Sequence, residues 1–292
     1  MKHFSIVKKA KVFFSISLIF LLVGVVSMLT RGFNLGIDFT GGSIIDVKFE
    51  NPVTVSEVRD VLSDHKLGSS IIQLGSMDGQ QTEESQSVLI RTGIISDDQR
   101  VETMTDMTNR LGPNEVLRVE NVGATVGRDL VKSAMGAVAL SWVLMIIYIT
   151  IRFEHNFAFA AIIALIIDVM VTLSWFSLLQ LEMDSSFVAA LLTVVGYSIN
   201  GTIVIFDRIR ENLHTHRRSE SLGDMVDNSI WQTMNRSIYT SATTLFAVFL
   251  FGGETIRNFS FAMLVGFSSG FYTSTFLAGP LWIKLRSRGT HK

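Results

Sequence analysis

Long apolar stretches that carry almost no charge alternate with polar segments along the 292 residues of this chain. Each stretch approaches the roughly 20 residues that a helix needs to cross about 30 Å of hydrocarbon. The six stretches comprise residues 12–29, 133–151, 157–179, 185–206, 237–253 and 259–283. One such stretch would also suit a buried helix of a soluble protein, but six favour a membrane protein. We therefore predict an α-helical integral membrane protein with six transmembrane helices.

The fourth stretch contains Asn200-Gly201, flanked by β-branched residues in the sequence VGYSINGTIVIFDRIREN. In a soluble protein, an Asn-Gly pair in this setting is a strong hairpin signal. A hairpin inside the bilayer would leave peptide groups without hydrogen-bond partners in hydrocarbon. We therefore predict one continuous helix through both residues.

Residues 31–132, between the first two stretches, have the pattern of a small mixed domain. Thr54 with Glu57, and Ser96 with Gln99, have capping-box spacing and predict the starts of two helices that end near residues 67 and 111. Alternating and β-branched runs predict strands at 43–49, 71–74, 87–91 and 115–122, with a polar loop at 76–85. The order β-α-β-β-α-β predicts one α+β, ferredoxin-like domain.

Composition supports a membrane protein and excludes several classes of function. Charged residues make up 17% of the chain and apolar residues 48%, whereas soluble domains are about a quarter charged. A net charge of −1 provides no basic field for nucleic acid. The chain has no cysteine, its six histidines are scattered, and it lacks a P-loop. We therefore expect no catalytic residues, no metal site and no cofactor.

The distribution of basic residues predicts the orientation of the chain in the membrane. Basic residues cluster before the first stretch, after the fourth and after the sixth, whereas segments 180–184 and 254–258 contain only Arg257. By the positive-inside rule both termini then lie in the cytoplasm. The predicted layout is 1–30 for the cytoplasmic N-terminus and first helix, 31–132 for the extracytoplasmic domain, 133–285 for helices two to six with a cytoplasmic loop at 207–236, and 286–292 for a cytoplasmic tail.

Three motifs together resemble those of the SecF proteins, one branch of the SecD/SecF protein-export family in the RND transporter superfamily. The motifs are FNLGIDFTGGS at 33–43, VGYSINGTIVIFDRIREN at 195–212, and the region from QTMNRSIYTSATTL to FGGETIRNF at 232–259. The resemblance covers nearly the whole chain. It implies half of a twelve-helix assembly in the bacterial cytoplasmic (inner) membrane, and the other half is SecD.

The resemblance also implies a function and a set of partners. The expected function is that of an accessory subunit of the Sec translocase, which uses the transmembrane ion gradient, as proton motive force or sodium, to drive or complete protein export. The expected partners are SecD, the SecYEG channel, YajC, exported preproteins and the surrounding lipid bilayer.

Gly201 is the clearest departure from the family pattern, in which Asp usually follows the Asn. Its neighbour Asn200 can form hydrogen bonds or ligate an ion, but it cannot titrate. Helical spacing places Thr193, Gly196, Asn200 and Asp207 on one face. This stripe can shape an ion path, or it can only pack against a neighbouring helix, where small residues such as Gly196 favour close contact.

Three further polar residues of the predicted spans match family positions in the ion pathway: Asp168 midway along the third stretch, and Arg236 and Thr240 one turn apart near the fifth. A charge at the bilayer centre costs on the order of 3 kcal/mol on insertion scales. Asp168 should therefore face the bundle and either pair or stay protonated. Its alternative role is structural pairing, with Arg236 or with polar residues of helix four. Arg236 cannot release its proton, so it acts electrostatically or marks the cytoplasmic interface.

Two groups of small residues complete the candidate set. Gly266 and Gly270 form a GxxxG pattern that is typical of close helix packing, within the bundle or against SecD. Asp38, Gly41 and Gly42 predict a tight turn between the first helix and the outer domain, with direct substrate contact as the alternative.

Three functions remain open at this point. They are an ion-coupled export subunit, a non-conducting scaffold that stabilises SecD and the channel, and a subunit of an RND-type exporter of small molecules or lipids. Six spans in place of twelve favour a subunit over an autonomous exporter. The missing acid at Gly201 favours the scaffold.

Overall fold

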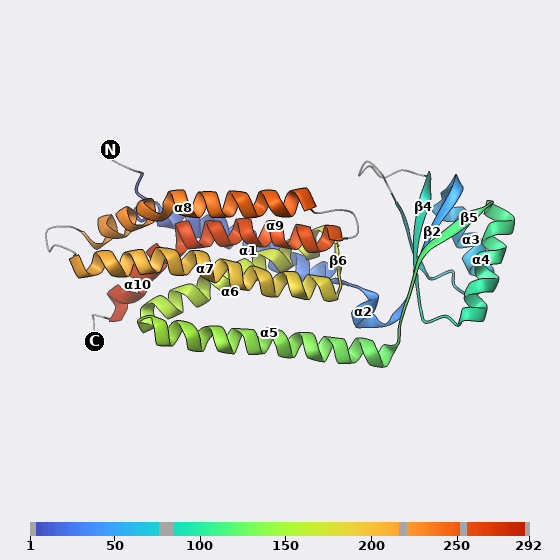
Figure 1. Cartoon of the computed structure of the whole chain (residues 1–292), viewed down its shortest axis with the longest axis horizontal. Coiled ribbons are helices and arrows are strands. Elements are labelled where there is room, and N and C mark those ends of the chain that lie inside the picture. The colour runs from blue at the N-terminus through green and yellow to red at the C-terminus, as the bar shows by residue number, and fades with distance from the viewer. Residues whose placement is uncertain (1–3, 76–83, 216–220, 252–255, 290–292) are drawn as a thin grey trace. The chain divides into compact units, whose positions relative to one another are not determined.

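The computed structural model describes residues 4–75, 84–215, 221–251 and 256–289, and it divides into two compact units. The first unit combines Met1–Asn34 with Met135–Lys292, and the second is Leu35–Ala134. The first unit consists of helices that run side by side, and the second is built on a β-sheet (Figure 1).

Long helices make up the first unit. They are α1 (Ala10–Arg31), most of α5 (Ala124–Arg152), α6 (His155–Leu179), α7 (Ser185–Thr215), α8 (Leu222–Phe251), α9 (Arg257–Tyr272) and α10 (Gly279–Gly289), with the π-helix η2 (Thr273–Ala278) and the short strands β1 (Asn34–Leu35) and β6 (Glu182–Met183). Helix α7 runs unbroken through Asn200 and Gly201, so the prediction of one continuous helix is confirmed. The beginning of α1 and the end of α10 lie at the same end of the bundle (Figure 1).

Five helical segments are long and apolar enough to cross a membrane. They are Ala10–Arg31, Thr125–Arg152, His155–Leu179, Ser185–Thr215 and Arg257–Ser287. The predicted span 237–253 falls on α8, which is not among the five in the part of the chain that the structure describes, and residues 252–253 lie outside that part. Arg236 and a series of hydroxyl side chains make the middle of α8 less apolar than the other spans.

Helices at one end of the bundle extend beyond the predicted spans. Helix α7 continues to Thr215 and α8 begins at Leu222, so the predicted loop 207–236 is helical at 207–215 and at 222–236. Apolar side chains of these extensions are buried in one core cluster together with the N-terminal segment and α10. The cluster includes Ile6, Ile209, Met225, Val226, Ile230 and Trp282.

The second unit is an antiparallel sheet covered on one face by two helices (Figure 1). Its elements are α2 (Ile37–Thr40), β2 (Gly42–Thr54), α3 (Val55–Asp64), β3 (Ile71–Leu74), β4 (Glu84–Thr92), α4 (Asp97–Leu111) and β5 (Asn114–Val122). The strands lie in the order β3-β4-β2-β5. Side chains such as Val47 and Phe49 of β2 pack with Val58 and Leu62 of α3 and Met107 of α4. Apart from the single turn of α2, the predicted sequence of strands and helices is confirmed.

Helix α3 begins with the predicted capping box. The Thr54 amide donates to Glu57 Oε2 at 2.8 Å, and the Glu57 amide donates to Thr54 Oγ1 at 3.2 Å. The helix ends at Asp64 and not near residue 67, because Lys66 adopts a positive φ of 61° that no α-helix accommodates.

The second predicted capping box is only half formed. Ser96 Oγ accepts from the Gln99 amide at 3.2 Å, but the Gln99 side chain donates to the His65 carbonyl at 3.2 Å.

The polar loop predicted at 76–85 is wrong at its end, because β4 already begins at Glu84 and pairs there with Thr54. Residues 76–83 lie outside the described residues.

Thr54→Ala is expected to lower the free energy of unfolding of the fragment Leu35–Ala134 by about 1 kcal/mol, the typical value of an N-cap. Hydrogen bonds from Thr54 lower the pKa of the Glu57 carboxyl. The contribution of Glu57 is therefore present above its ordinary pKa and is lost as the pH falls through the lower pKa of the folded state. Urea denaturation at neutral and acidic pH measures both effects.

Thr105→Ala is the matched control for this prediction. The exposed Thr105 hydroxyl donates only to the Val101 carbonyl of its own helix, so we expect a change within about 0.5 kcal/mol. Equal losses for both variants, or a fragment without a cooperative transition, would contradict the prediction.

Candidate functional site

Asp168, midway along α6, has no exposed surface. Three hydroxyl groups surround its carboxylate. Ser269 Oγ donates to Oδ1 at 2.6 Å, Thr273 Oγ1 lies 2.9 Å from both oxygens, and Ser198 Oγ donates to Oδ2. We call Asp168 and these three residues the hydroxyl cage. The prediction that Asp168 faces the bundle is confirmed.

The hydroxyl cage joins three helical elements to α6. Ser198 comes from α7, Ser269 from α9, and Thr273 is the first residue of the π-helix η2. Close packing brings them together, since a Cβ added to Gly270 would lie 3.2 Å from Ser198 Cα. Single π-turns inside helices are frequent at functional sites.

The partners of Asp168 decide between the two structural pairings that the sequence left open. Within the described ranges, the carboxylate is bonded to hydroxyl groups and to no Lys, Arg or His side chain. The carboxylate therefore contacts Ser198, a polar residue of helix four, and not Arg236.

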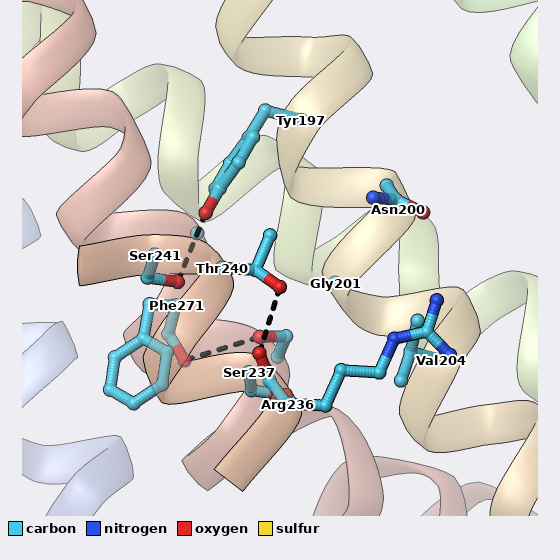
Figure 2. A pocket seen from close by; sticks show the side chains of 11 residues that line it. Tyr197, Asn200, Gly201, Val204, Arg236, Ser237, Thr240, Ser241 and Phe271 are labelled. Atoms are coloured by element: carbon cyan, nitrogen blue, oxygen red, sulfur yellow. Dashed lines mark hydrogen bonds between the residues drawn. The ribbon is translucent and has the colours of Figure 1, made fainter. Parts of the chain in front are cut away.

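A small polar pocket lies beside the hydroxyl cage, between α7, α8 and the α9–η2 segment (Figure 2). Its volume is about 70 Å³, and Asn200, Gly201, Arg236 and Thr240 all line it. Four of the predicted residues thus come together from two helices. Asp168 does not line this pocket, but its partner Thr273 directly precedes a lining residue, Ser274.

Polar groups face one another across this pocket. Tyr197 Oη donates to Ser241 Oγ at 3.0 Å, and Thr240 Oγ1 donates to the Arg236 carbonyl one turn earlier at 2.8 Å. The Arg236 side chain extends toward α7 (Figure 2). Its guanidinium forms no ion pair with any carboxylate in the described part of the chain.

The predicted stripe on α7 is exposed at Thr193, Gly196 and Asn200 and half-buried at Asp207. Gly201 is not part of the stripe and lies on the inward side, where an added Cβ would be 3.3 Å from Ser274 Oγ. Asp207 forms an ion pair with Arg152 at 3.2 Å. Polar groups such as Asn200 are costly against lipid and normally face protein or water.

The two glycines of the GxxxG pattern lie where α9 crosses α7. A Cβ at Gly266 would lie 2.2 Å from Val194 Cγ2, far inside contact distance, and one at Gly270 would lie against Ser198. A Cβ at Gly196 would have no neighbour within 4 Å among the residues that the structure describes. A requirement for glycine within the bundle is therefore present at Gly266 and Gly270, and absent at Gly196.

Gly266→Ala is expected to destabilise the bundle by about 1–3 kcal/mol, because the added methyl group overpacks the contact with Val194. Gly196→Ala, on the exposed face of α7, should change stability by no more than about 0.5 kcal/mol. Thermal unfolding of the purified chain without its partner, in one detergent, measures both. A smaller loss at Gly266 than at Gly196 would contradict this account of the crossing.

The turn before the sheet of the second unit also depends on glycine. Gly41 follows α2 with φ +73°, and Gly42 has φ +141° with a virtual Cβ only 2.6 Å from the Thr92 carbonyl oxygen. Asp38 lies in the first turn of α2. A side chain at residue 42 would be strained by both its φ and this contact.

Sequence reasoning missed three of the four members of the hydroxyl cage. Ser198, Ser269 and Thr273 lie in apolar spans, where hydroxyl groups commonly bond to carbonyls of their own helix. The spacing of four between Ser269 and Thr273 was the available signal, because it places both on one helix face. In the residues that the structure describes, no group of three or more His, Cys, Asp or Glu could hold a metal ion.

Two family models match this chain. The model described as "Protein export membrane protein SecD/SecF, C-terminal" matches residues 102–288, and the "SecD/SecF GG Motif" model matches residues 26–53. Proteins named "Protein translocase subunit SecF" are similar over nearly the full length. The one from Acidaminococcus fermentans is 77% identical, over 99% of both chains, and the one from Sebaldella termitidis is 42% identical, over 96% of this chain and 91% of the relative.

Two solved structures of SecDF are also similar to this chain. The crystal structure of SecDF from Thermus thermophilus has a TM-score of 0.87 and 31% identity, and the match covers 98% of this chain and 39% of that one. SecDF in a super-membrane-facing form has a TM-score of 0.72 and 32% identity, covering 100% and 40%. This chain therefore spans well under half the length of either solved SecDF chain.

Proposed function

Because the chain belongs to the SecD/SecF family of protein-export membrane proteins and is an accessory subunit of the Sec protein translocase, we propose that it couples the transmembrane ion gradient to protein export together with a SecD partner. The hydroxyl cage and the adjoining polar pocket are the part of the chain that we assign to this coupling. Relatives of this chain carry the name of translocase subunits, and we assign no nucleotide hydrolysis to it.

The observation that carries this proposal is the buried carboxylate of Asp168 without a cationic partner in the described residues. An isolated charge in such a place is costly by several kcal/mol, so the site favours a bound positive charge. Oxygen contacts of 2.6 to 2.9 Å are hydrogen-bonding distances. A proton fits this spacing without moving any of the three hydroxyl groups, which is why we assign a proton rather than a sodium ion to the cage.

Exchange of this proton requires a path to the polar pocket. Thr273 Oγ1 contacts Asp168, and the next residue, Ser274, lines the pocket beside Gly201. A hydroxyl group both donates and accepts, so Thr273 and Ser274 can pass a proton toward Asn200 and Thr240. Arg236 stays charged, and we assign to it the electrostatic role of opposing a second cation in the pocket.

The exposed polar face beside this pocket supports a partner that covers it. Thr193, Asn200, Arg236 and Thr240 are exposed on α7 and α8 in this chain, where contact with lipid is unfavourable. We infer that the SecD half lies against this face and supplies the ionisable group that Gly201 does not. The SecYEG channel, YajC and exported preproteins are the further partners of the proposed complex.

We infer six spans, with α8 as the fifth, and both termini in the cytoplasm of a bacterial inner membrane. Asp227 near the start of α8 accepts from the amides of Ile6 and Val7 at 3.0 and 2.9 Å, and Arg152 pairs with Asp207. The N-terminal segment and both basic connections therefore lie at one end of the bundle, which the positive-inside rule assigns to the cytoplasm. The unit Leu35–Ala134 is then extracytoplasmic, and we infer a ferredoxin-like fold from its strand order.

Purification of the tagged full chain from membranes tests this proposal against its alternatives. We expect SecD and the channel to copurify, and the reconstituted complex to conduct protons during export. Copurification without any ion flux would favour the non-conducting scaffold, which the missing acid at Gly201 also favours. Flux that depends on a small molecule or lipid and not on the channel would favour an RND-type exporter.

A further inference from the structure

A second hollow of about 440 Å³ continues along the contact between α7 and α8. It is lined by Val204, Asp207, Arg208 and Glu211 of α7 and by Gln232 and Arg236 of α8. It lies at the end of the bundle that we place in the cytoplasm, as its charged lining and the neighbouring Arg152–Asp207 pair indicate. We call it the vestibule.

The vestibule and the polar pocket share two residues, Val204 and Arg236. On α8, the vestibule residue Gln232, the shared Arg236 and the pocket residue Thr240 follow one another at intervals of four. On α7, Val204 is one turn beyond Asn200 and one turn before Arg208. Each interval is about 6 Å along a helix axis, so the two hollows lie in series, with Val204 and Arg236 between them.

Both hollows are suited to water. A cavity needs roughly 10–15 Å³ to hold a water molecule, together with polar partners, and the polar pocket has about 70 Å³ with hydroxyl, amide and guanidinium groups in its wall. The vestibule is larger and has four ionic side chains. Water that enters the vestibule is then separated from water in the pocket by two side chains.

The two arginines of the vestibule differ in how they are held. Arg208 is fixed by Gln232 Oε1 and Glu211 Oε2, each at 2.6 Å. The Arg236 guanidinium has no such partner in the described residues, so it is the charged group that can move without breaking an ion pair. A positive charge repels small cations most strongly where water is scarce and the effective dielectric constant is low.

We propose that Val204 and Arg236 form a cation-excluding gate between the cytoplasmic vestibule and the polar pocket. The vestibule admits water and small ions from the cytoplasm, and the Arg236 guanidinium opposes the entry of cations into the pocket while it lies in the passage beside Val204. The role of this gate in ion coupling rests on the proposed function. The gate itself only controls whether ions in the vestibule reach the polar pocket. It can therefore be tested without export or ion flux.

The absence of cysteine from this chain allows single thiols to report access. Gln232→Cys probes the vestibule, Ser274→Cys probes the pocket, and Ile205→Cys, a buried position, reports background. Inside-out vesicles that contain the full chain with a cysteine-free SecD partner are treated with silver ion from the cytoplasmic side. Thiols that bound silver are then protected from a maleimide added after denaturation.

We expect rapid protection at Gln232→Cys and slow protection at Ser274→Cys. Arg236→Gln should accelerate protection at Ser274→Cys by about tenfold or more, as removal of a modest repulsion in the path predicts. Arg208→Gln, which removes a vestibule charge that the pocket does not share, should leave that rate unchanged. Val204→Trp should slow Ser274→Cys and leave Gln232→Cys unaffected, and it keeps the test decisive if Arg236→Gln does not fold.

Three results would overturn the gate. The first is an equal rate of silver protection at Ser274→Cys with Arg236 and with Arg236→Gln. The second is an acceleration by Arg208→Gln as large as that by Arg236→Gln, and the third is an unchanged rate in Val204→Trp. Gated access in vesicles that conduct no ions would support the gate and reject ion coupling. Ion flux in vesicles where silver reaches Ser274→Cys freely would support ion coupling and reject the gate. Failure of the gate can therefore be distinguished from failure of the proposed function.

Discussion

Gly201→Asp is expected to raise export-linked ion flux through the complex and to change its dependence on pH. No residue between 194 and 206 ionises near neutral pH, so the substitution adds a titrating group to α7. The new Cβ would lie 3.3 Å from Ser274 Oγ, a contact that a small shift of this hydroxyl relieves. The carboxylate would then share the polar pocket with Arg236. A positioned proton carrier contributes on the order of 100-fold in enzymes, and we expect at least about tenfold here.

Gly201→Asn separates the added charge from the added volume. Asparagine occupies nearly the same space but cannot titrate, so its flux should stay near that of the unmodified chain. Proton flux in reconstituted vesicles, measured across a pH series for both variants, gives the comparison. If Asp and Asn at this position behave alike, the polar pocket does not carry the ion.

Asp168→Asn is expected to abolish export-linked flux while the bundle stays folded. The amide retains an oxygen that accepts hydrogen bonds from the cage, but it cannot take up a proton. Asp168→Ala should lose flux and stability together, because three buried hydroxyl groups lose their acceptor. Each unsatisfied buried donor costs about 1–3 kcal/mol, less where a hydroxyl turns back to a carbonyl of its own helix.

Asp184→Asn is the matched control for the loss of an acid. Asp184 lies before α7, where its carboxylate accepts from the Phe187 amide at 2.8 Å. Asparagine caps a helix about as well as aspartate, so this replacement should change stability by less than about 0.5 kcal/mol and leave the flux intact. Flux and thermal unfolding of the same preparations distinguish the two acids. Undiminished flux in Asp168→Asn would make the hydroxyl cage a structural contact only.

Features that depend on local rules were predictable from the sequence. Helix α7 continues through Asn200 and Gly201 because a bilayer leaves an unpaired turn no water to bond with. The capping box at Thr54 sets the start of α3, and Gly112, with φ +99°, ends α4 as expected of a glycine before proline. Each of these features depends only on residues that lie within about one helical turn of it in the sequence.

Features that depend on packing between distant segments were not predictable. Strand β2 continues to Thr54, beyond the predicted end at residue 49, because Val53 and Thr54 pair with β4. Helix α5 begins at Ala124, before the predicted span starts at residue 133. The more polar segment 124–132 is also compatible with a helix once strand β5 has ended. The hydroxyl cage requires three elements to meet at Asp168, and no spacing along the chain specifies that meeting.

Completion of a stalled export intermediate by an ion gradient alone tests the central claim most directly. A preprotein is arrested partway through the channel in vesicles that contain SecD and this chain, ATP is removed, and a proton gradient is imposed. The account predicts completion that requires the gradient, stops with a protonophore, and is lost without this chain or with Asp168→Asn. Completion that is unaffected by the protonophore, or equally efficient without this chain, would contradict it.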